Sequence, residues 1–322
     1  MAKLFLGNRL RKRVDSSPAL RRLRWAIEAG VLAGLWRTSA WMTPERASET
    51  GGRLLRWVGP RLHKTRHFRR NQVLAFPGSS EAEIDRLVRE AWGNLGAVLA
   101  EYPHLDTIRT ERIETVTKCD LEPIREGRRR AIFVAAHLAN WEVTVAPAVG
   151  LGIPVTAIYT PFENPWVDRM LYRHRQALGC RLVPRGDALR TIMRELDAGR
   201  SIGLLVDQRV DSGEPVPFFG IEKLTTVVPA RLALRFDCDL IPVRVERLPA
   251  AHFRVTAYEP VTCKDRTLSQ HGRALEMTRQ INALFEDWIR ELPEQWFCSN
   301  RRWAKTATPP LQGYAGRPVT AH

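Results

Sequence analysis

The chain has 322 residues, of which 44% are apolar and 26% are charged, as in an ordinary globular protein. These values exclude a largely disordered chain, a collagen-like repeat and a polytopic membrane protein, and the length suits one large α/β domain or two small ones. The net charge of +15 lies mostly in residues 1–70, where 17 Lys and Arg face 4 Asp and Glu, which favours nucleic acid, an anionic bilayer or an acidic carrier protein as a partner.

The basic start of the chain is not followed by the apolar core of a signal peptide. The most apolar stretch, residues 29–36, is far shorter than the roughly 20 residues that span a bilayer. We therefore expect residues 1–43 to form a basic amphipathic segment that lies on an anionic membrane surface. The alternative is an ordinary helix packed on the domain. The side chains expected to enter the headgroup region are Trp25, Leu32, Leu35, Trp36 and Trp41.

Helix signals dominate the first hundred residues. Thr43 precedes a proline and predicts an N-cap, with a helix to about residue 58. The basic segment 61–76 predicts a second helix. Ser80 and Glu83 form a capping-box pattern, which predicts a third helix that runs to about residue 101.

From residue 131 onward, short apolar runs alternate with helical patterns. Such runs are typical of strands buried on both faces, and they occur at residues 131–136, 155–159, 202–206 and 240–245. The helical patterns cover residues 165–178, 188–198, 227–236 and 268–292. This alternation predicts an α/β fold with a mainly parallel central sheet flanked by helices, after a helical N-terminal region. Residues 306–322 are expected to form a mobile tail.

The segment HLANWE directly follows the first predicted strand and carries His137 and Glu142. Open α/β sheets place their sites where a strand ends and a helix begins. A carboxylate five residues after a histidine could hold one ring nitrogen as N–H and leave the other free to remove a proton from a hydroxyl. The alternative is a turn histidine beside a glutamate that only complements a helix dipole.

A second polar group follows the strand at 202–206 and points to the same rim of the sheet. It consists of Asp207, Gln208 and Arg209. The loop after it carries Phe218, Phe219 and Gly220, whose rings either line a substrate site or fill the core.

Arg185 ends a short predicted strand at residues 181–184 and suits a phosphate, although it could equally be a surface charge. The five cysteines are widely spaced and form no C-x-x-C pair, so neither a disulfide framework nor a thiolate metal site is expected. No glycine-rich nucleotide loop is visible either, and we expect no metal and no resident cofactor.

In this order, these motifs resemble the lysophospholipid acyltransferase superfamily, and within it the lipid A biosynthesis late acyltransferases of lauroyl or myristoyl type. The resemblance covers roughly residues 40–305 and includes the ending PEQWFCSNRRW at residues 293–303. It implies an acyltransferase domain at residues 44–305 that moves an acyl chain from a thioester, acyl carrier protein or acyl-CoA, to a hydroxyl of a lipid A precursor. It further implies His137 as general base, Glu142 as its orienting carboxylate, and the cytoplasmic face of the inner membrane as the location.

Two features depart from the family pattern. Residues 23–42 are too polar for the transmembrane helix with which many relatives begin, and Thr160 stands where many carry an arginine after the tyrosine at Tyr159. The arginines that could replace it in headgroup recognition are Arg169, Arg173 and Arg175.

Two further predictions concern the acyl donor and the rival functions. Arg301 and Arg302 are expected to dock an acidic acyl carrier protein, whereas the arginine run at 128–130 lies at the opposite end of its strand and is expected to form a solvated turn. The alternatives are an acyltransferase for another glycolipid or lysophospholipid, or a basic membrane- or nucleic-acid-binding protein without catalysis. No motif favours nucleic acid.

Overall fold

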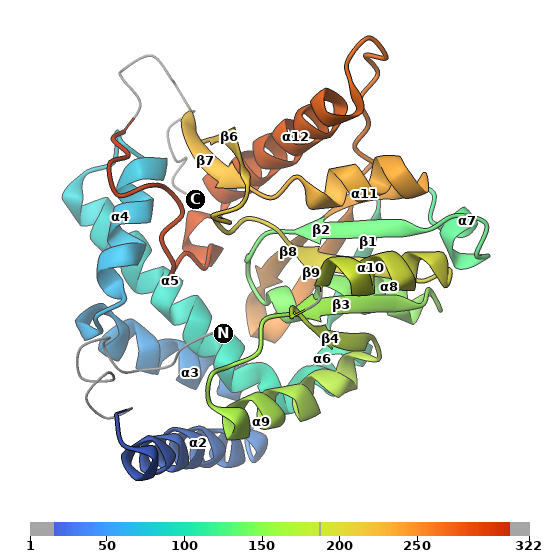
Figure 1. The fold of residues 1–322 in the computed structure, drawn as a ribbon. Helices are drawn as coiled ribbons and strands as arrows, with labels where there is room; N and C mark the ends of the chain where they lie inside the picture. The colour runs from blue at the N-terminus through green and yellow to red at the C-terminus, as the bar shows by residue number, and fades with distance from the viewer. Residues whose placement is uncertain (1–15, 187, 310–322) are drawn as a thin grey trace.

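A mixed sheet of seven strands forms the centre of the protein in the computed structural model, which describes residues 16–186 and 188–309 (Figure 1). The strand order is β1-β9-β8-β2-β5-β3-β4. The strands are β1 (Ile113–Thr117), β2 (Ala131–Ala135), β3 (Val155–Tyr159), β4 (Arg181–Pro184), β5 (Ser201–Leu205), β8 (Asp239–Leu248) and β9 (His252–Ala257). The five strands from β8 to β4 run parallel, whereas β9 is antiparallel to β8 and carries β1 beside it. The prediction of a mainly parallel sheet is confirmed.

The four apolar runs that predicted strands correspond to β2, β3, β5 and β8, and the short strand at residues 181–184 is β4. Strands β1 and β9 were not predicted. The segment expected to be a loop is instead a hairpin made of β6 (Glu214–Phe218) and β7 (Ile221–Thr225), which pair with each other and form a separate two-stranded sheet.

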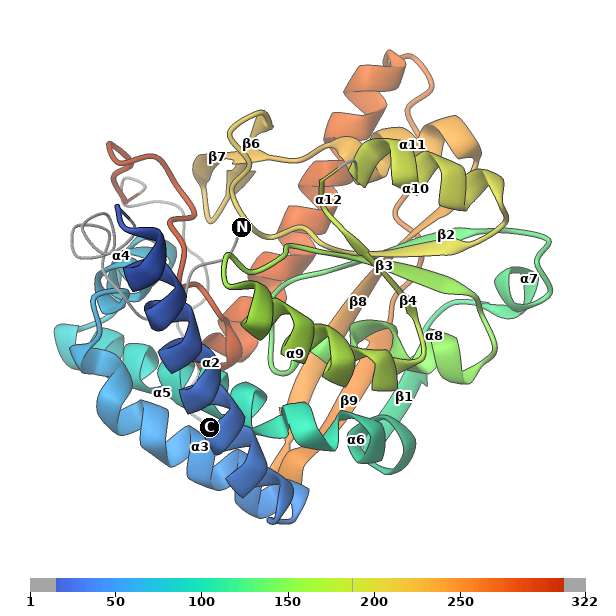
Figure 2. The same ribbon diagram turned by 60° about the horizontal axis from the view of Figure 1, so that its bottom comes forward.

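Within the described residues, the helical N-terminal region before α6 and the sheet consists of α2 (Pro18–Ala40), α3 (Pro44–Val58), α4 (Thr65–Ala75) and α5 (Glu81–Glu101). Thr43 caps α3 and Ser80 forms the expected capping box with Glu83. Helices α3 and α5 cross very closely. A Cβ atom on Gly96 would lie only 2.1 Å from the carbonyl oxygen of Gly51, so the crossing requires a glycine there. These helices lie beyond the carboxyl ends of the parallel strands, as Figures 1 and 2 show.

The remaining helices cover both faces of the sheet and create two hydrophobic cores. They are α6 (Leu105–Glu111), α7 (Glu122–Arg125), α8 (Ala146–Gly150), α9 (Pro165–Arg175), α10 (Ala188–Asp197), α11 (Val228–Phe236) and α12 (Gln270–Glu291). Side chains of β2 alternate between the cores, with Ile132 and Val134 in the one that includes α10, α11 and α12. Phe133 and Ala135 belong to the other, with α6, α8 and α9. This double coverage explains why the central strand β2 is apolar along its whole length.

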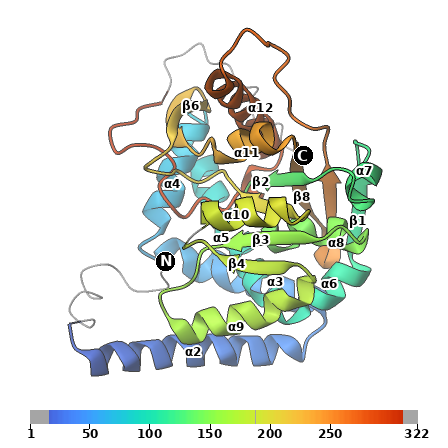
Figure 3. The ribbon, with the colours of Figure 1, turned by 45° about the vertical axis from the view of Figure 1, so that its right-hand side comes forward.

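Helix α2 lies at the outer edge of the molecule beside α9 (Figure 3). Its inner face contains a buried ion pair between Arg24 and Glu28, 2.8 Å apart, and the amide of Asn164 donates to Glu28 as well. Leu32 and Trp36 are also buried, so the expectation that they enter a membrane is wrong. Apolar residues occur on both sides of this helix, so the sequence did not show which side is buried. The side that carries Leu32 and Trp36 packs against α5 and α9.

The outer face of α2 is aliphatic. Its exposed large apolar residues recur every three or four positions and therefore lie along one side of the helix: Leu20, Leu23, Ile27, Val31 and Leu35. Trp41, which follows the helix, is 77% exposed. Within the described residues, none of the helices combines the length and the apolar character needed to cross a bilayer.

The predicted domain limits, including a boundary at residue 43, stay predictions. Residues 1–15 and 310–322 lie outside the described part of the chain, so the basic start and most of the expected C-terminal tail are outside it as well.

Candidate active site

The turn after β2 carries the first group of predicted site residues. His137 follows the end of the strand by two residues, and Ala139 has a positive φ of 48°, which few side-chain-bearing residues adopt. Asn140 then caps the short 3₁₀-helix η3 (Trp141–Val145), because its side chain accepts a hydrogen bond of 3.2 Å from the backbone N–H of Glu142. The strained backbone thus separates His137 from Glu142.

Two distant segments hold this turn in place. The backbone N–H of Phe297 donates to the carbonyl of His137 at 2.8 Å, and that of Ala139 donates to the carbonyl of Gln295 at 3.0 Å. From α5, the side-chain amide of Asn94 donates to the carbonyl of Ala139 at 3.0 Å. The C-terminal segment that follows α12 is therefore part of the site's framework.

His137 is paired with Asp207, at 2.5 Å between the ring Nδ1 and a carboxylate oxygen. The pairing follows from the sheet, because Ala135 of β2 lies opposite Leu205 of β5, and each site residue comes two positions later. Asp207 is fully buried, whereas the His137 side chain is 12% exposed. The prediction that polar groups at these two strand ends meet is confirmed.

Three further groups surround Asp207. Its second carboxylate oxygen accepts hydrogen bonds from Arg302 at 3.0 Å and from the indole N–H of Trp296 at 3.2 Å. The ammonium group of Lys223 donates to its backbone carbonyl at 2.8 Å. Burial by itself would raise the pKa of Asp207, but the positive charges of His137 and Arg302 outweigh it and hold that pKa well below its usual value.

Glu142 does not orient His137, contrary to the prediction. Both of its carboxylate oxygens bind the guanidinium group of Arg175 at 2.7 Å, and Tyr102 donates to one of them at 2.7 Å. The indole of Trp141 adds a bond of 3.1 Å. Burial would raise the pKa of Glu142, but the charge of Arg175 and these hydrogen bonds lower it. The side chain points to α9 because η3 begins only after the chain has turned at Ala139.

The second ring nitrogen of His137 is not in contact with Asp207. The side-chain nitrogen of Gln208 lies 3.1 Å from Nε2, and with Asp207 accepting from Nδ1–H, Nε2 is the acceptor of this bond. Trp141 and Phe297 stack on each other at 4.9 Å and flank the imidazole. A hydroxyl group that displaces the Gln208 amide could therefore give its proton to Nε2.

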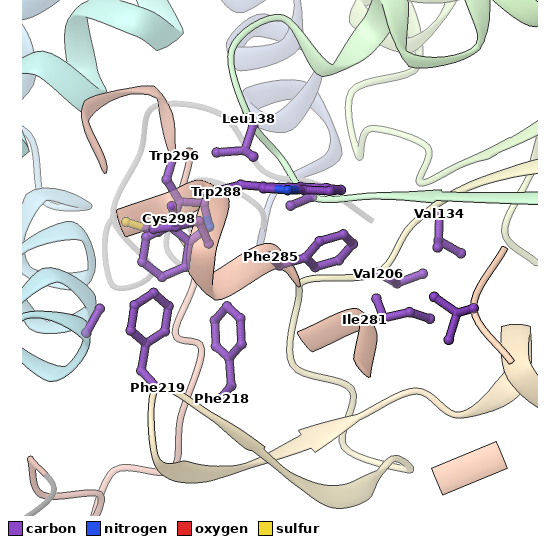
Figure 4. Packing of buried hydrophobic residues seen from close by; sticks show 14 of the residues in the cluster. Val134, Leu138, Val206, Phe218, Phe219, Ile281, Phe285, Trp288, Trp296 and Cys298 are labelled. Carbon is purple, nitrogen blue, oxygen red and sulfur yellow. The ribbon is translucent and has the colours of Figure 1, made fainter. Parts of the chain in front are cut away.

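The hairpin residues do not present aromatic rings to a substrate, contrary to the first interpretation. Phe218 and Phe219 are fully buried and point from the hairpin toward Trp296, and Figure 4 shows them in this cluster. The alternative, that they fill the core, is confirmed. Gly220 has a φ of 69°, which suits the hairpin turn between β6 and β7.

The predicted arginines have different surroundings. Arg185 is exposed just after β4, at the same sheet edge as His137, so it stays a candidate phosphate ligand. Arg209 pairs with Asp211 at 2.5 Å. Arg301 is half-buried, but Arg302 is fully buried against Asp207, so the prediction that both arginines form a docking surface is wrong for Arg302.

The arginines of α9 also divide into two kinds. Arg169 and Arg173 are exposed and stay candidates for headgroup recognition, whereas Arg175 is occupied by Glu142. In the arginine run before β2, Arg129 pairs with Asp239 at the end of the sheet opposite His137, which agrees with a solvated turn.

Sequence reasoning missed the roles of Tyr102 and Arg175 around Glu142 and that of Lys223 beside Asp207. Tyr102 ends a helix and Lys223 lies in a hairpin, so neither position carries a motif. For Arg175, the only available signal was its position on α9, the helix that follows strand β3 of the central sheet. Among the described residues, no group of three or more His, Cys, Asp or Glu side chains is arranged to hold a metal ion.

A histidine–carboxylate pair at the carboxyl ends of two central parallel strands is an arrangement suited to general-base chemistry. The particular family follows from sequence comparison. Residues 14–305 match the model of the bacterial lipid A biosynthesis acyltransferases, and the chain belongs to this family.

Individual relatives are distant in sequence but similar in extent. A lipid A biosynthesis acyltransferase of Haemophilus influenzae is 22% identical over 76% of this chain and 77% of the relative. Lipid A biosynthesis acyltransferase 2 of Shigella flexneri is 25% identical over 83% and 85%. The lipid A biosynthesis palmitoleoyltransferase of Escherichia coli K12 is 23% identical over 73% and 77%. The family membership supports acyl transfer in lipid A biosynthesis.

Proposed function

We propose that this protein is an O-acyltransferase that moves a fatty acyl chain from an acyl thioester to a hydroxyl of a lipid A precursor or a related glycolipid. One observation supports this more than any other. His137 is held through Nδ1 by a buried carboxylate, and its Nε2 is an acceptor whose bond from the Gln208 amide a substrate hydroxyl could replace. A hydroxyl is a poor nucleophile at neutral pH, so such a base is what the reaction needs.

The proposed reaction requires no covalent enzyme intermediate. The acceptor hydroxyl gives its proton to Nε2 of His137 as its oxygen attacks the carbonyl carbon of the thioester. The tetrahedral intermediate then expels the thiolate, the carbon–sulfur bond breaks, and the imidazolium returns the proton to the leaving sulfur. Asp207 keeps the proton on Nδ1 and stabilises the imidazolium throughout. The products are an ester and a free thiol.

Glu142 has a different role in this proposal. Through Arg175 and Tyr102 it ties η3 to α9 and to the end of α5, so it orders the turn that carries His137. It is therefore a positioning residue, and Asp207 takes the orienting role that the sequence motif implied for Glu142.

Acyl carrier protein is the proposed donor, with acyl-CoA as the alternative. A carrier of this kind is acidic, and a positively charged surface speeds its encounter with the enzyme. Of the predicted docking pair, only Arg301 is accessible enough to contribute. The donor is a substrate, and the proposed chemistry needs no resident metal or cofactor.

The proposed location is the cytoplasmic face of the inner membrane, with α2 lying on the bilayer. The outer face of this helix is aliphatic and exposed in the described part of the chain, and arginines flank it. Arg21 lies over the ring of Trp25 at 5.3 Å and Arg37 over that of Trp41 at 5.5 Å, which suits the boundary between acyl chains and anionic headgroups.

Turnover of defined substrates tests this proposal. Purified protein should transfer the acyl chain of an acyl carrier protein thioester to a lipid A precursor. His137→Ala should lower kcat by roughly 10²–10⁴-fold, because a general base is lost. The matched control is His271→Ala, which changes an exposed histidine at the start of α12. A His137→Ala variant with the wild-type rate contradicts the mechanism.

The acceptor is tested in cells by mass spectrometry of the lipids of a deletion strain. Loss of one secondary acyl chain from lipid A supports the proposal. A change confined to another glycolipid or to phospholipids supports the alternative acceptor, and unchanged lipids support the binding protein without catalysis.

A further inference from the structure

The guanidinium group of Arg302 lies on the far side of Asp207 from His137. Its Nη2 is 3.0 Å from one carboxylate oxygen of Asp207, and the other oxygen is the one that contacts Nδ1. The same nitrogen donates to the carbonyl of Phe297 at 2.8 Å. Arg302 is fully buried, so its charge is screened little by water.

Arg302 is brought to this place by a segment that comes last in the fold. Asn71 of α4 donates to the carbonyls of Cys298 and Asn300, at 2.7 Å each, and accepts a bond of 3.2 Å from the backbone N–H of Arg302. This buried amide therefore fixes both ends of the segment 298–302. The backbone of Arg302 is therefore fixed by α4, and its guanidinium group is held by Asp207 and by the carbonyl of Phe297.

The charged groups around Asp207 come from four elements. His137 approaches from the end of β2, Arg302 from the C-terminal segment and Lys223 from β7, whose ammonium group binds the backbone carbonyl rather than the carboxylate. Glu286 of α12 faces Lys223, but its carboxylate is held by Arg290 at 2.8 Å. Arg302 is thus the one cation, among the described residues, that shares the carboxylate with His137.

We propose that Arg302 is a positioning residue for acyl transfer, and that its charge sets the pH range in which His137 acts as a base. This inference rests on the proposed function. The guanidinium group holds the Asp207 carboxylate so that its free oxygen faces Nδ1. It also takes up part of the negative charge that would otherwise stabilise the imidazolium form of His137. Without it, the histidine should keep its proton to higher pH.

The C-terminal segment therefore contributes to the chemistry of the site as well as to its shape. In this proposal, Asp207 shares its negative charge between His137 and Arg302 only when the C-terminal segment is packed on α4, because this segment carries Arg302. The two neighbouring arginines therefore have different roles. Arg302 is fully buried beside Asp207, whereas Arg301 is half-buried and remains partly accessible to solvent.

The test compares Arg302→Met with Arg302→Lys and with Arg301→Met. Arg302→Met removes the charge and keeps an apolar chain of similar length, Arg302→Lys restores the charge, and Arg301→Met is the control for the pH midpoint alone. We measure kcat/KM against pH, and independently titrate His137 by ¹⁵N NMR, with its signal assigned from His137→Gln. Arg302→Met should move both midpoints upward by about one pH unit. Arg302→Lys should recover most of that shift, and Arg301→Met should cause none.

Several outcomes overturn the inference. A folded Arg302→Met variant with reduced kcat and unchanged midpoints means that the role of Arg302 is only structural. An equal shift in Arg301→Met means that the effect is general electrostatics. If Arg302→Met does not fold, Arg302→Lys decides: wild-type midpoints with kcat reduced less than tenfold support the inference, and displaced midpoints despite the retained charge overturn it.

The proposed function fails independently. The NMR titration needs no turnover, so it tests the electrostatic link even if no acceptor is known. Conversely, full activity of His137→Ala removes the proposed function whatever Arg302→Met does to the titration of the histidine.

Discussion

Replacing Asp207 with asparagine is the perturbation that separates the two candidate partners of His137. The substitution keeps the shape of the side chain and removes its charge. In the wild type the carboxylate oxygen is 2.5 Å from Nδ1 and can only accept, so the proton stays on Nδ1. An amide can donate there instead, which favours the tautomer with the proton on Nε2. That tautomer cannot accept a proton from the acceptor hydroxyl.

The expected loss is that of the general base. Asp207→Asn should lower kcat by roughly 10²–10⁴-fold, which corresponds to about 3–5 kcal/mol of transition-state stabilisation. KM should change little, because Asp207 is fully buried and does not touch the substrate. The variant also leaves Arg302 without its ionic partner, and an unpaired buried charge costs about 3–5 kcal/mol of stability. Its unfolding temperature should fall accordingly.

The matched control is Glu142→Gln, since Glu142 is also a buried carboxylate held by an arginine. It should lose stability and some kcat, because the turn is less ordered, but keep the acidic limb of its pH–rate profile. In Asp207→Asn, this limb should move to lower pH, because no carboxylate stabilises the imidazolium. Steady-state kinetics from pH 5 to 9, on variants shown to be folded by circular dichroism, provide the measurement. The reverse result, in which only Glu142→Gln displaces the limb, refutes Asp207 as the orienting group.

Three further predictions concern stability and membrane binding. Gly96→Ala should destabilise the protein by about 1–3 kcal/mol in urea unfolding, because its Cβ would lie 2.1 Å from a carbonyl oxygen of α3, whereas Gly34→Ala has open space around it and should be neutral or stabilising. Ile27→Gln with Val31→Gln should weaken sedimentation with anionic vesicles without lowering turnover of a soluble acceptor analogue, and unchanged sedimentation contradicts the role of α2. Burial lowers the pKa of Lys223 to about 7, so above that pH the unfolded chain binds a proton that the folded chain lacks, and the folded state gains stability up to the ordinary lysine pKa. Lys223→Met should lack this gain, so its unfolding free energy relative to wild type should be highest at or below pH 7 and decline toward pH 10.

Much of the architecture was readable from local sequence. Apolar runs predicted β2, β3, β5 and β8, because strands covered by helices on both faces consist largely of apolar residues. The caps at Thr43 and Ser80 predicted where α3 and α5 begin, since these side chains satisfy backbone N–H groups next to them in sequence. Local chemistry was sufficient for these elements.

Elements at the sheet's edge were not readable in this way. Strand β1 has the sequence IETVT and is only half-buried, so it shows no apolar run, and it pairs with β9, about 140 residues later in the chain. The hairpin of β6 and β7 contains two prolines in its first strand, which disfavour a strand in sequence analysis. It is stable because Phe218 and Phe219 are buried against residues of the C-terminal segment.

For the site, the sequence by itself determined that His137 and Asp207 end two buried strands, and that both belong to one rim of a parallel sheet. Only the tertiary structure decided that they are partners, because the register that places Ala135 opposite Leu205 brings the residues after them together. The tertiary structure also decided that Glu142 pairs with Arg175 and that Arg302 pairs with Asp207. Whether a charge lies on the surface or pairs in the interior depends on which distant segment packs against it, and no local pattern encodes that choice.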